Sequence, residues 1–133
     1  MERHSRDDLA QIPLFRHLSR RRRRALARGA VRLDLPAGYV LFDEGSEGHE
    51  FVAVLGGEIE VRRDGEVVAA LAAGDYLGEA ALVTRTRRNA SAVTRTDATI
   101  VCIGAADFDD VASRSPAVAE EVRVTAAHRQ TSA

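Results

Sequence analysis

Lysine is absent from this sequence, and all 19 basic residues are arginine. Alanine is abundant throughout the chain, so the use of arginine instead of lysine reflects a general compositional bias. An isolated arginine is therefore weak evidence for a binding site. An arginine becomes informative only through the residues that surround it.

Disulfides and membrane segments are also missing. The single cysteine, Cys102, has no partner for an internal disulfide, and it lies in the apolar run Thr99–Ile103, where a small buried thiol is expected. The longest apolar run, Val67–Ala73, is far shorter than the roughly 20 residues of a membrane-spanning helix. The charged N-terminus does not resemble a secretory leader. We therefore expect a cytoplasmic protein that does not enter a membrane.

Signs of a metal centre or of catalysis are missing as well. The four histidines are scattered, and no His-x-His pair of the kind found in metal-binding β-barrels occurs. No potential nucleophile has a plausible neighbouring base. We expect neither a bound metal nor an enzymatic activity.

Charge is unevenly distributed along the chain. Residues 1–24 carry eight arginines and three acidic residues, a net of +5, so the remainder carries −6 of the total of −1. The run Arg20–Arg24 suggests nucleic-acid binding. Consecutive residues of a helix are about 100° apart, however, so these five side chains should surround the helix instead of forming one stripe. We interpret the run as a solvated helix face, with nucleic-acid binding as a less favoured alternative.

The length of 133 residues suits a single domain with one core and no stabilising disulfide or metal. Hydrophobic periodicity divides it into a helical entry (1–30), a β-rich middle (31–104) and two C-terminal helices (105–130). About eight short strands are expected in the middle part. We predict a mainly β fold, an antiparallel β-roll or jelly-roll-like barrel flanked by helices.

Several local signals support this division. Pro13 breaks the first helix, and Ser19 is placed to cap a second helix that ends at Gly29. The dipeptide Asp64-Gly65 lies between two strand-like segments and accepts the positive φ of a type I′ turn. Ser115 precedes a proline, the usual start of a helix, here expected to end near Arg129.

One polar stretch, "GEAALVTRTRRNASAV" from residue 78, interrupts the strands. A short helix opening at Gly78 would expose backbone N–H groups with the positive end of the helix dipole behind them, an arrangement that attracts phosphate. The small side chains of Ala80 and Ala81 would let a ligand approach the backbone. Arg88, on the following strand, would add a charge-assisted hydrogen bond to the same anion.

Glu79 is unexpected in such a place, because a carboxylate repels phosphate. It is explained if it accepts a hydrogen bond from a nearby hydroxyl, such as that of a ribose. A cyclic nucleotide carries both groups and is compact enough for a small barrel. A solvated loop with incidental charges is the alternative on these residues alone.

Three separated segments resemble the cyclic nucleotide-binding domain of the catabolite activator protein, the regulatory subunits of cAMP-dependent kinase and gated ion channels. "IPLFRHLS" is similar to the helical entry of that family, "LPAGYVLFDEGSEGHEFVAVLGGEIEV" to its first strands and "GDYLGEAAL…RRNASAV" to its phosphate-binding cassette. The resemblance extends from about Leu9 to Val122.

The resemblance implies a ligand, cAMP or cGMP, and a role for each cassette residue. Glu79 would bind the ribose 2′-hydroxyl, Arg88 and the backbone of Ala80 and Ala81 would bind the cyclic phosphate, and the backbone near Asn89 would support it. The expected binding residues, all within the cassette at residues 78–91, are Gly78, Glu79, Ala80, Ala81, Leu82, Arg88, Asn89, Ala90 and Ser91.

Two residues depart from the family pattern. Arg87 stands where the family usually has proline, which leaves the phosphate ligand open between Arg87 and Arg88, with the spacing favouring Arg88. Asn89 adds an amide within reach of the phosphate or the base. The sequence does not discriminate between cAMP and cGMP.

The resemblance also implies a regulatory mechanism. The final helix should close over the base, and Leu82 should transmit ligand binding by packing near Phe108. Partners would be a separate effector protein or an effector domain of a longer chain, with a homodimer also conceivable. The alternative is a degenerate domain that serves only as a protein-interaction module.

Overall fold

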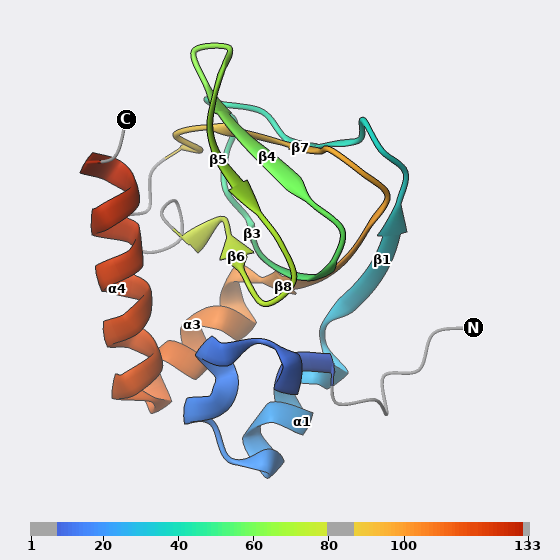
Figure 1. Cartoon of the computed structure of the whole chain (residues 1–133). Coiled ribbons are helices and arrows are strands. Elements are labelled where there is room, and N and C mark those ends of the chain that lie inside the picture. Colours follow the sequence, from blue (N-terminus) through green and yellow to red (C-terminus); the bar gives the residue numbers. More distant parts are fainter. Residues whose placement is uncertain (1–7, 80–86, 132–133) are drawn as a thin grey trace.

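The computed structural model describes residues 8–79 and 87–131, and within them eight strands form two antiparallel sheets flanked by helices (Figure 1). One sheet has the order β1 (Val31–Leu35), β8 (Ala98–Gly104), β3 (Glu50–Gly56), β6 (Tyr76–Leu77). The other has the order β2 (Val40–Phe42), β7 (Ser91–Thr94), β4 (Ile59–Arg63), β5 (Glu66–Leu71). The helices are η1 (Asp8–Gln11), η2 (Pro13–His17), α1 (Arg20–Arg28), α3 (Ala105–Arg114) and α4 (Pro116–Thr131). The predicted antiparallel roll is confirmed.

The β4–β5 hairpin forms as predicted. Asp64 and Gly65 have φ angles of 53° and 81°, the left-handed conformation that a type I′ turn requires at both central positions. Arg63 pairs with Glu66 directly across the turn. Further along, Val61 pairs with Ala69 and Arg62 pairs with Val67, so Val68 is an extra residue of β5. This is a β-bulge.

The helix ends also follow the local sequence. The Ser19 hydroxyl accepts a hydrogen bond of 3.2 Å from the backbone N–H of Arg22, which caps α1. Gly29 ends this helix with a φ of −97°, which any residue can adopt. A Cβ atom there would lie 2.6 Å from Oδ2 of Asp107 on α3, so a larger residue would require the exposed Asp107 side chain to shift.

The last helix, α4, begins at Pro116 and is capped by Ser115, whose hydroxyl accepts from the N–H of Val118 at 3.3 Å. It extends two residues beyond the predicted end, to Thr131. Its apolar residues Val118, Val122 and Ala126 are buried, at most 2% exposed. None of the described helices is both long and apolar enough to cross a membrane.

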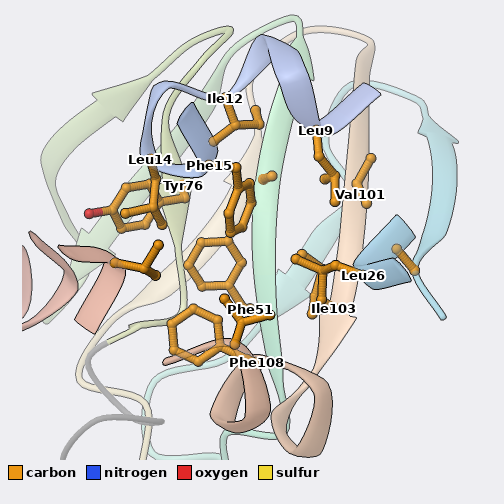
Figure 2. Packing of buried hydrophobic residues seen from close by; sticks show 14 of the residues in the cluster. Leu9, Ile12, Leu14, Phe15, Leu26, Phe51, Tyr76, Val101, Ile103 and Phe108 are labelled. Carbon is orange, nitrogen blue, oxygen red and sulfur yellow. The ribbon is translucent and has the colours of Figure 1, made fainter. Parts of the chain in front are cut away.

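The core has two layers, one on each face of β3, because successive side chains of a strand point to opposite faces. Val52 and Val54 pack between the two sheets, together with Cys102, and burial raises the pKa of this thiol to about 11. Phe51 points to the other face, where the ring of Phe108 stacks on it with the two ring centroids 4.6 Å apart (Figure 2). The helices thus cover the outer face of the sheet that contains β3. The sheet that contains β4 and β5 remains available to line a cavity.

Candidate functional site

The cassette begins at Gly78 and Glu79, directly after β6. Gly78 has a φ of 89°, which favours glycine. A Cβ atom there would lie 2.6 Å from the carbonyl oxygen of Glu50 and 2.7 Å from Nη1 of Arg88, so glycine is needed for these segments to meet. Glu79 follows and is only 1% exposed. A carboxylate buried to this extent requires polar partners.

Arg88 lies beside this turn and is also buried, at 6% exposure. Its Nη1 donates to the carbonyl of Gly78 at 3.1 Å and its Nη2 to the carbonyl of Glu50 at 2.9 Å. The guanidinium carbon lies 4.1 Å from the centre of the Phe42 ring. Burial lowers the pKa of Arg88. The site thus holds an oriented cation whose Nε–H has no hydrogen-bond partner among the described residues.

Arg87 is placed differently from its neighbour. It pairs with Glu47 as an isolated β-bridge, and its exposed side chain donates to the carbonyl of Gly45 at 3.2 Å. The backbone N–H of Arg88 donates to the carbonyl of Ser46 at 2.8 Å. The acidic segment at residues 43–50 is largely exposed, and its backbone carbonyls at Gly45 and Ser46 accept hydrogen bonds from Arg87 and Arg88.

A residue of the last helix completes the site. The guanidinium of Arg129, in the final turn of α4, forms an ion pair with the Glu79 carboxylate. The same guanidinium lies 5.4 Å from the ring centre of Tyr76, whose hydroxyl is 2.8 Å from Oγ1 of Thr125. Burial, with a further contribution from the charge of Glu79, raises the pKa of Tyr76. α4 is therefore joined to the cassette through the residue expected to bind ribose.

Arg63, at the end of β4, makes a second connection between the cassette and α4. Its Nε donates to the carbonyl of Asn89 at 3.1 Å, and its Nη2 donates to the carbonyl of Arg129 at 3.3 Å. The last carbonyls of a helix have no intrahelical partner, so Arg63 satisfies one of them. Arg63 and Arg129 could not be selected from the sequence, because nothing local separates them from the other arginines.

These residues surround one cavity of about 640 Å³, its open mouth included. The polar side consists of Arg63, Glu79, Arg88, Asn89 and Arg129. Most of the remaining lining is apolar and consists of Phe42, Val61, Val68, Ala69, Leu71 and Leu77. Because of the bulge at Val68, two consecutive residues of β5, Val68 and Ala69, both line this cavity.

Most of the predicted site residues that the structure describes meet in this cavity. Gly78, Glu79, Arg88, Asn89 and Ala90 line it. Ser91 is not part of the lining; its hydroxyl accepts a hydrogen bond of 2.8 Å from the backbone N–H of Glu44.

The other predictions for the cassette concern residues that the structure does not cover. Ala80, Ala81 and Leu82 lie outside the described residues, as does the helix expected after Gly78. Phe108, the proposed partner of Leu82, is buried in the core, where it stacks on Phe51.

The arrangement suits a ligand with three different parts. A buried guanidinium fits an anionic group, and a buried carboxylate fits a hydroxyl donor. The apolar wall fits a ring. Among residues 8–79 and 87–131, no cluster of His, Cys, Asp or Glu is placed to hold a metal ion.

Comparison with known families agrees with this chemistry. The model of the cyclic nucleotide-binding domain matches residues 32–115, which is most of the chain. The chain belongs to this family. A cyclic nucleotide-gated potassium channel of Rhizobium etli is 30% identical over 122 residues, which are 92% of this chain and 34% of the channel. The cAMP-dependent protein kinase regulatory subunit of Schizosaccharomyces pombe is 34% identical over 89 residues, 66% of this chain and 22% of the subunit.

The fold of this cyclic nucleotide-binding domain is also found in solved structures. The regulatory domain of Toxoplasma gondii PKA with cAMP has a TM-score of 0.84 and 21% identity, and the match covers 95% of this chain and 50% of that one. At this identity the likeness establishes the fold only. The chain spans about a third or less of the length of the two relatives described above.

The residues present fit a cyclic nucleotide. The Nε of Arg88, which has no partner among the described residues, is a buried donor suited to a phosphate oxygen. Glu79 has two carboxylate oxygens with about four acceptor positions, so it can accept from a hydroxyl while it remains paired with Arg129.

Proposed function

We propose that this domain binds cAMP or cGMP as a non-catalytic regulatory module, with Arg88 on the cyclic phosphate and Glu79 on the ribose 2′-hydroxyl. One observation carries the proposal: a buried cation and a buried carboxylate share a single cavity that has an apolar wall. Such groups are stable in a core only when they are paired or hydrogen-bonded, and a cyclic nucleotide supplies a matching group to each.

Arg88 would bind phosphate strongly because its position is fixed before the ligand arrives. Its two terminal nitrogens are held by the carbonyls of Gly78 and Glu50, which orients the guanidinium plane. Burial removes competing water, so the attraction between the guanidinium and an anion is less screened than at the surface. The apolar residues of the cavity lining would accept the purine ring.

The same geometry supports coupling between the ligand and α4. Glu79 would accept from the ribose and from Arg129 at once, so ligand and helix share one carboxylate. Arg63 connects the carbonyls of Asn89 and Arg129, one in the cassette and one in the helix. A ligand that favours this closed arrangement shifts the population of α4 toward it. The effector would be a separate protein or another domain of a longer chain.

Calorimetric titration with cAMP, cGMP and the non-cyclic 5′-AMP tests the binding proposal. Arg88→Ala should weaken the preferred cyclic nucleotide by about 2–3 kcal/mol, roughly 30- to 150-fold, because a buried phosphate loses its charged partner. Arg87→Ala is the matched control, since that side chain is exposed and outside the cavity lining, and should change affinity by less than about threefold. Circular dichroism establishes that both variants are folded.

Equal losses for the two variants would contradict the assignment of Arg88. If folded wild-type protein binds neither cyclic nucleotide at millimolar concentration, the domain is instead a protein-interaction module that retains only the fold. Amide hydrogen exchange tests the coupling separately. Protection of residues 116–129 should rise with ligand, and protection of the cassette alone would show that α4 is no lid.

A further inference from the structure

The outer face of α1 carries a concentrated positive charge. One shallow hollow is lined by Ala25 and by four exposed arginines, Arg20, Arg21, Arg24 and Arg28. We call these four arginines the α1 arginine face.

This arrangement differs from the even distribution expected of five consecutive arginines. Arg22 donates its Nη1 to the carbonyl of Arg114 at 3.0 Å, and Arg23 donates its Nη1 to the carbonyl of Leu18 at 3.3 Å. Both turn away from the hollow. Arg28, one turn beyond Arg24, then extends the face along the helix.

The four arginines form no ion pair with any residue in the described part of the chain. Elsewhere, pairing with a carboxylate is common: the paired arginines are Arg16, Arg32, Arg62, Arg95, Arg114, Arg123 and Arg129. The sequence of α1 contains no acidic residue. A general preference for arginine therefore does not explain this face, because arginines elsewhere in the same chain have acidic partners.

The face also opposes the stability of its own helix. Arg20 and Arg21 lie at the N-terminus of α1, where the helix dipole is unfavourable to cations. Arg24 lies four residues from both Arg20 and Arg28, and like charges at this spacing repel each other. Departures from local stability rules tend to occur at functional sites.

We propose that the α1 arginine face docks an acidic segment of a partner protein. Arg20, Arg24 and Arg28 succeed one another at about 6 Å along the helix, given a rise of about 1.5 Å per residue. Alternate residues of an extended chain are about 6.6 Å apart. An extended segment with Asp or Glu at every second position would therefore bring successive carboxylates to these guanidinium groups.

The charge of the surroundings favours a narrow acidic segment over a broad polyanion. The chain as a whole carries −1, so outside its basic N-terminal part it is acidic. A nucleic-acid duplex or an anionic membrane would meet these negative charges as well, whereas a single acidic strand would contact mainly the arginines.

The docked segment would leave the nucleotide cavity accessible. α1 lies at the end of the molecule opposite the β4–β5 hairpin, and β4 and β5 both contribute to the cavity (Figure 1). Docking of an acidic segment on α1 therefore does not depend on nucleotide binding at the cavity, and the two are tested separately.

Fluorescence anisotropy with the whole chain tests this docking. The probe is a labelled peptide with glutamate at alternate positions, and its glutamine counterpart is the matched control peptide. The double variant Arg24→Gln/Arg28→Gln should weaken binding of the glutamate peptide about tenfold, as expected for two ion pairs of up to about 1 kcal/mol each. Arg95→Gln/Arg123→Gln removes two exposed charges elsewhere and should change affinity less than twofold.

Several outcomes would overturn the proposal. These are equal losses for both double variants, no binding of the glutamate peptide at low salt, and tighter binding of a 20-base-pair duplex or of vesicles rich in phosphatidylserine. Concentration-dependent self-association that the Arg24→Gln/Arg28→Gln change abolishes would make a second copy of the chain the occupant instead.

A stability measurement tests the premise without any ligand. Arg21→Glu places an acidic residue in the first turn of α1, three residues before Arg24, and should raise the melting temperature by about 2–4 °C. An unchanged or lower melting temperature would show that the arginines do not strain the helix, and the inference would lose its physical basis.

Discussion

The ion pair between Glu79 and Arg129 predicts a measurable energetic link between the cassette and the last helix. Arg129→Gln removes the charge but keeps a polar side chain in the final turn of α4. Glu79→Gln removes the opposite charge in nearly the same volume. Because Glu79 also has other interactions, the two single variants and the double variant are needed to isolate the pair itself.

The burial of the two partners sets the expected magnitude. The side chain of Glu79 is 1% exposed and that of Arg129 is 31% exposed. Exposed pairs contribute about 0.2–1 kcal/mol, whereas breaking a fully buried pair costs about 3–5 kcal/mol. A pair with one buried and one partly exposed member should lie between these limits. We expect a coupling free energy of about 1–2 kcal/mol and a loss of about 1–3 kcal/mol for Arg129→Gln alone.

Urea unfolding of the four proteins, monitored by circular dichroism, gives these free energies. The coupling should decrease in high salt only moderately, because the buried carboxylate is poorly screened. Additive effects of the two substitutions, within about 0.3–0.5 kcal/mol, would refute the reasoning. In that case Arg129 would lie near Glu79 without holding α4 against the cassette.

Three further predictions follow from individual residues. The 2′-deoxy analogue should bind the wild type about tenfold more weakly than its parent nucleotide, and Glu79→Gln should shrink this difference; equal binding of both nucleotides by the unmodified protein would remove Glu79 from the site. Gly78→Ala should destabilise the fold by more than Gly45→Ala, because Gly45 has a similar φ of 88° but no atom within 4 Å of the added Cβ. The backbone strain that both substitutions introduce is about 1–2 kcal/mol. Equal melting temperatures of the two variants would contradict the steric argument. Burial raises the pKa of Cys102 from 9.0 to about 11, so the thiol contributes stability below pH 9 that is lost as the pH rises toward 11, by up to about 2–3 kcal/mol. The free energy of unfolding of Cys102→Ala should fall less over this pH range than that of the wild type. Parallel falls in the two proteins would argue against the pKa shift.

Local sequence was sufficient for most of the architecture. Asp64 and Gly65 specify their turn because few other residue pairs tolerate two positive φ angles. Ser19 and Ser115 mark helix starts because their hydroxyls accept from N–H groups only three residues away. Such interactions lie within one turn of the chain, so a short segment contains all the information that they need.

The candidate cassette residues could also be selected from the sequence. Glu79 and Arg88 stand out because a carboxylate and a guanidinium flank a run of small residues. Their burial was not evident, since it depends on Glu50 and Phe42, which lie far away in the sequence. In the sequence, only the spacing favours Arg88 over Arg87 as the phosphate ligand. In the tertiary structure, Arg88 lines the cavity and Arg87 does not.

The contribution of α4 was decided by tertiary structure alone. Arg129 meets Glu79 across fifty positions of sequence, and Arg63 reaches Arg129 from a strand still further away. No local pattern encodes such contacts, because they depend on how α4 packs through Val118 and Val122. The α1 arginine face arose in the same way: the sequence determined five adjacent arginines, and contacts with α3 and the entry segment determined which of them turned away.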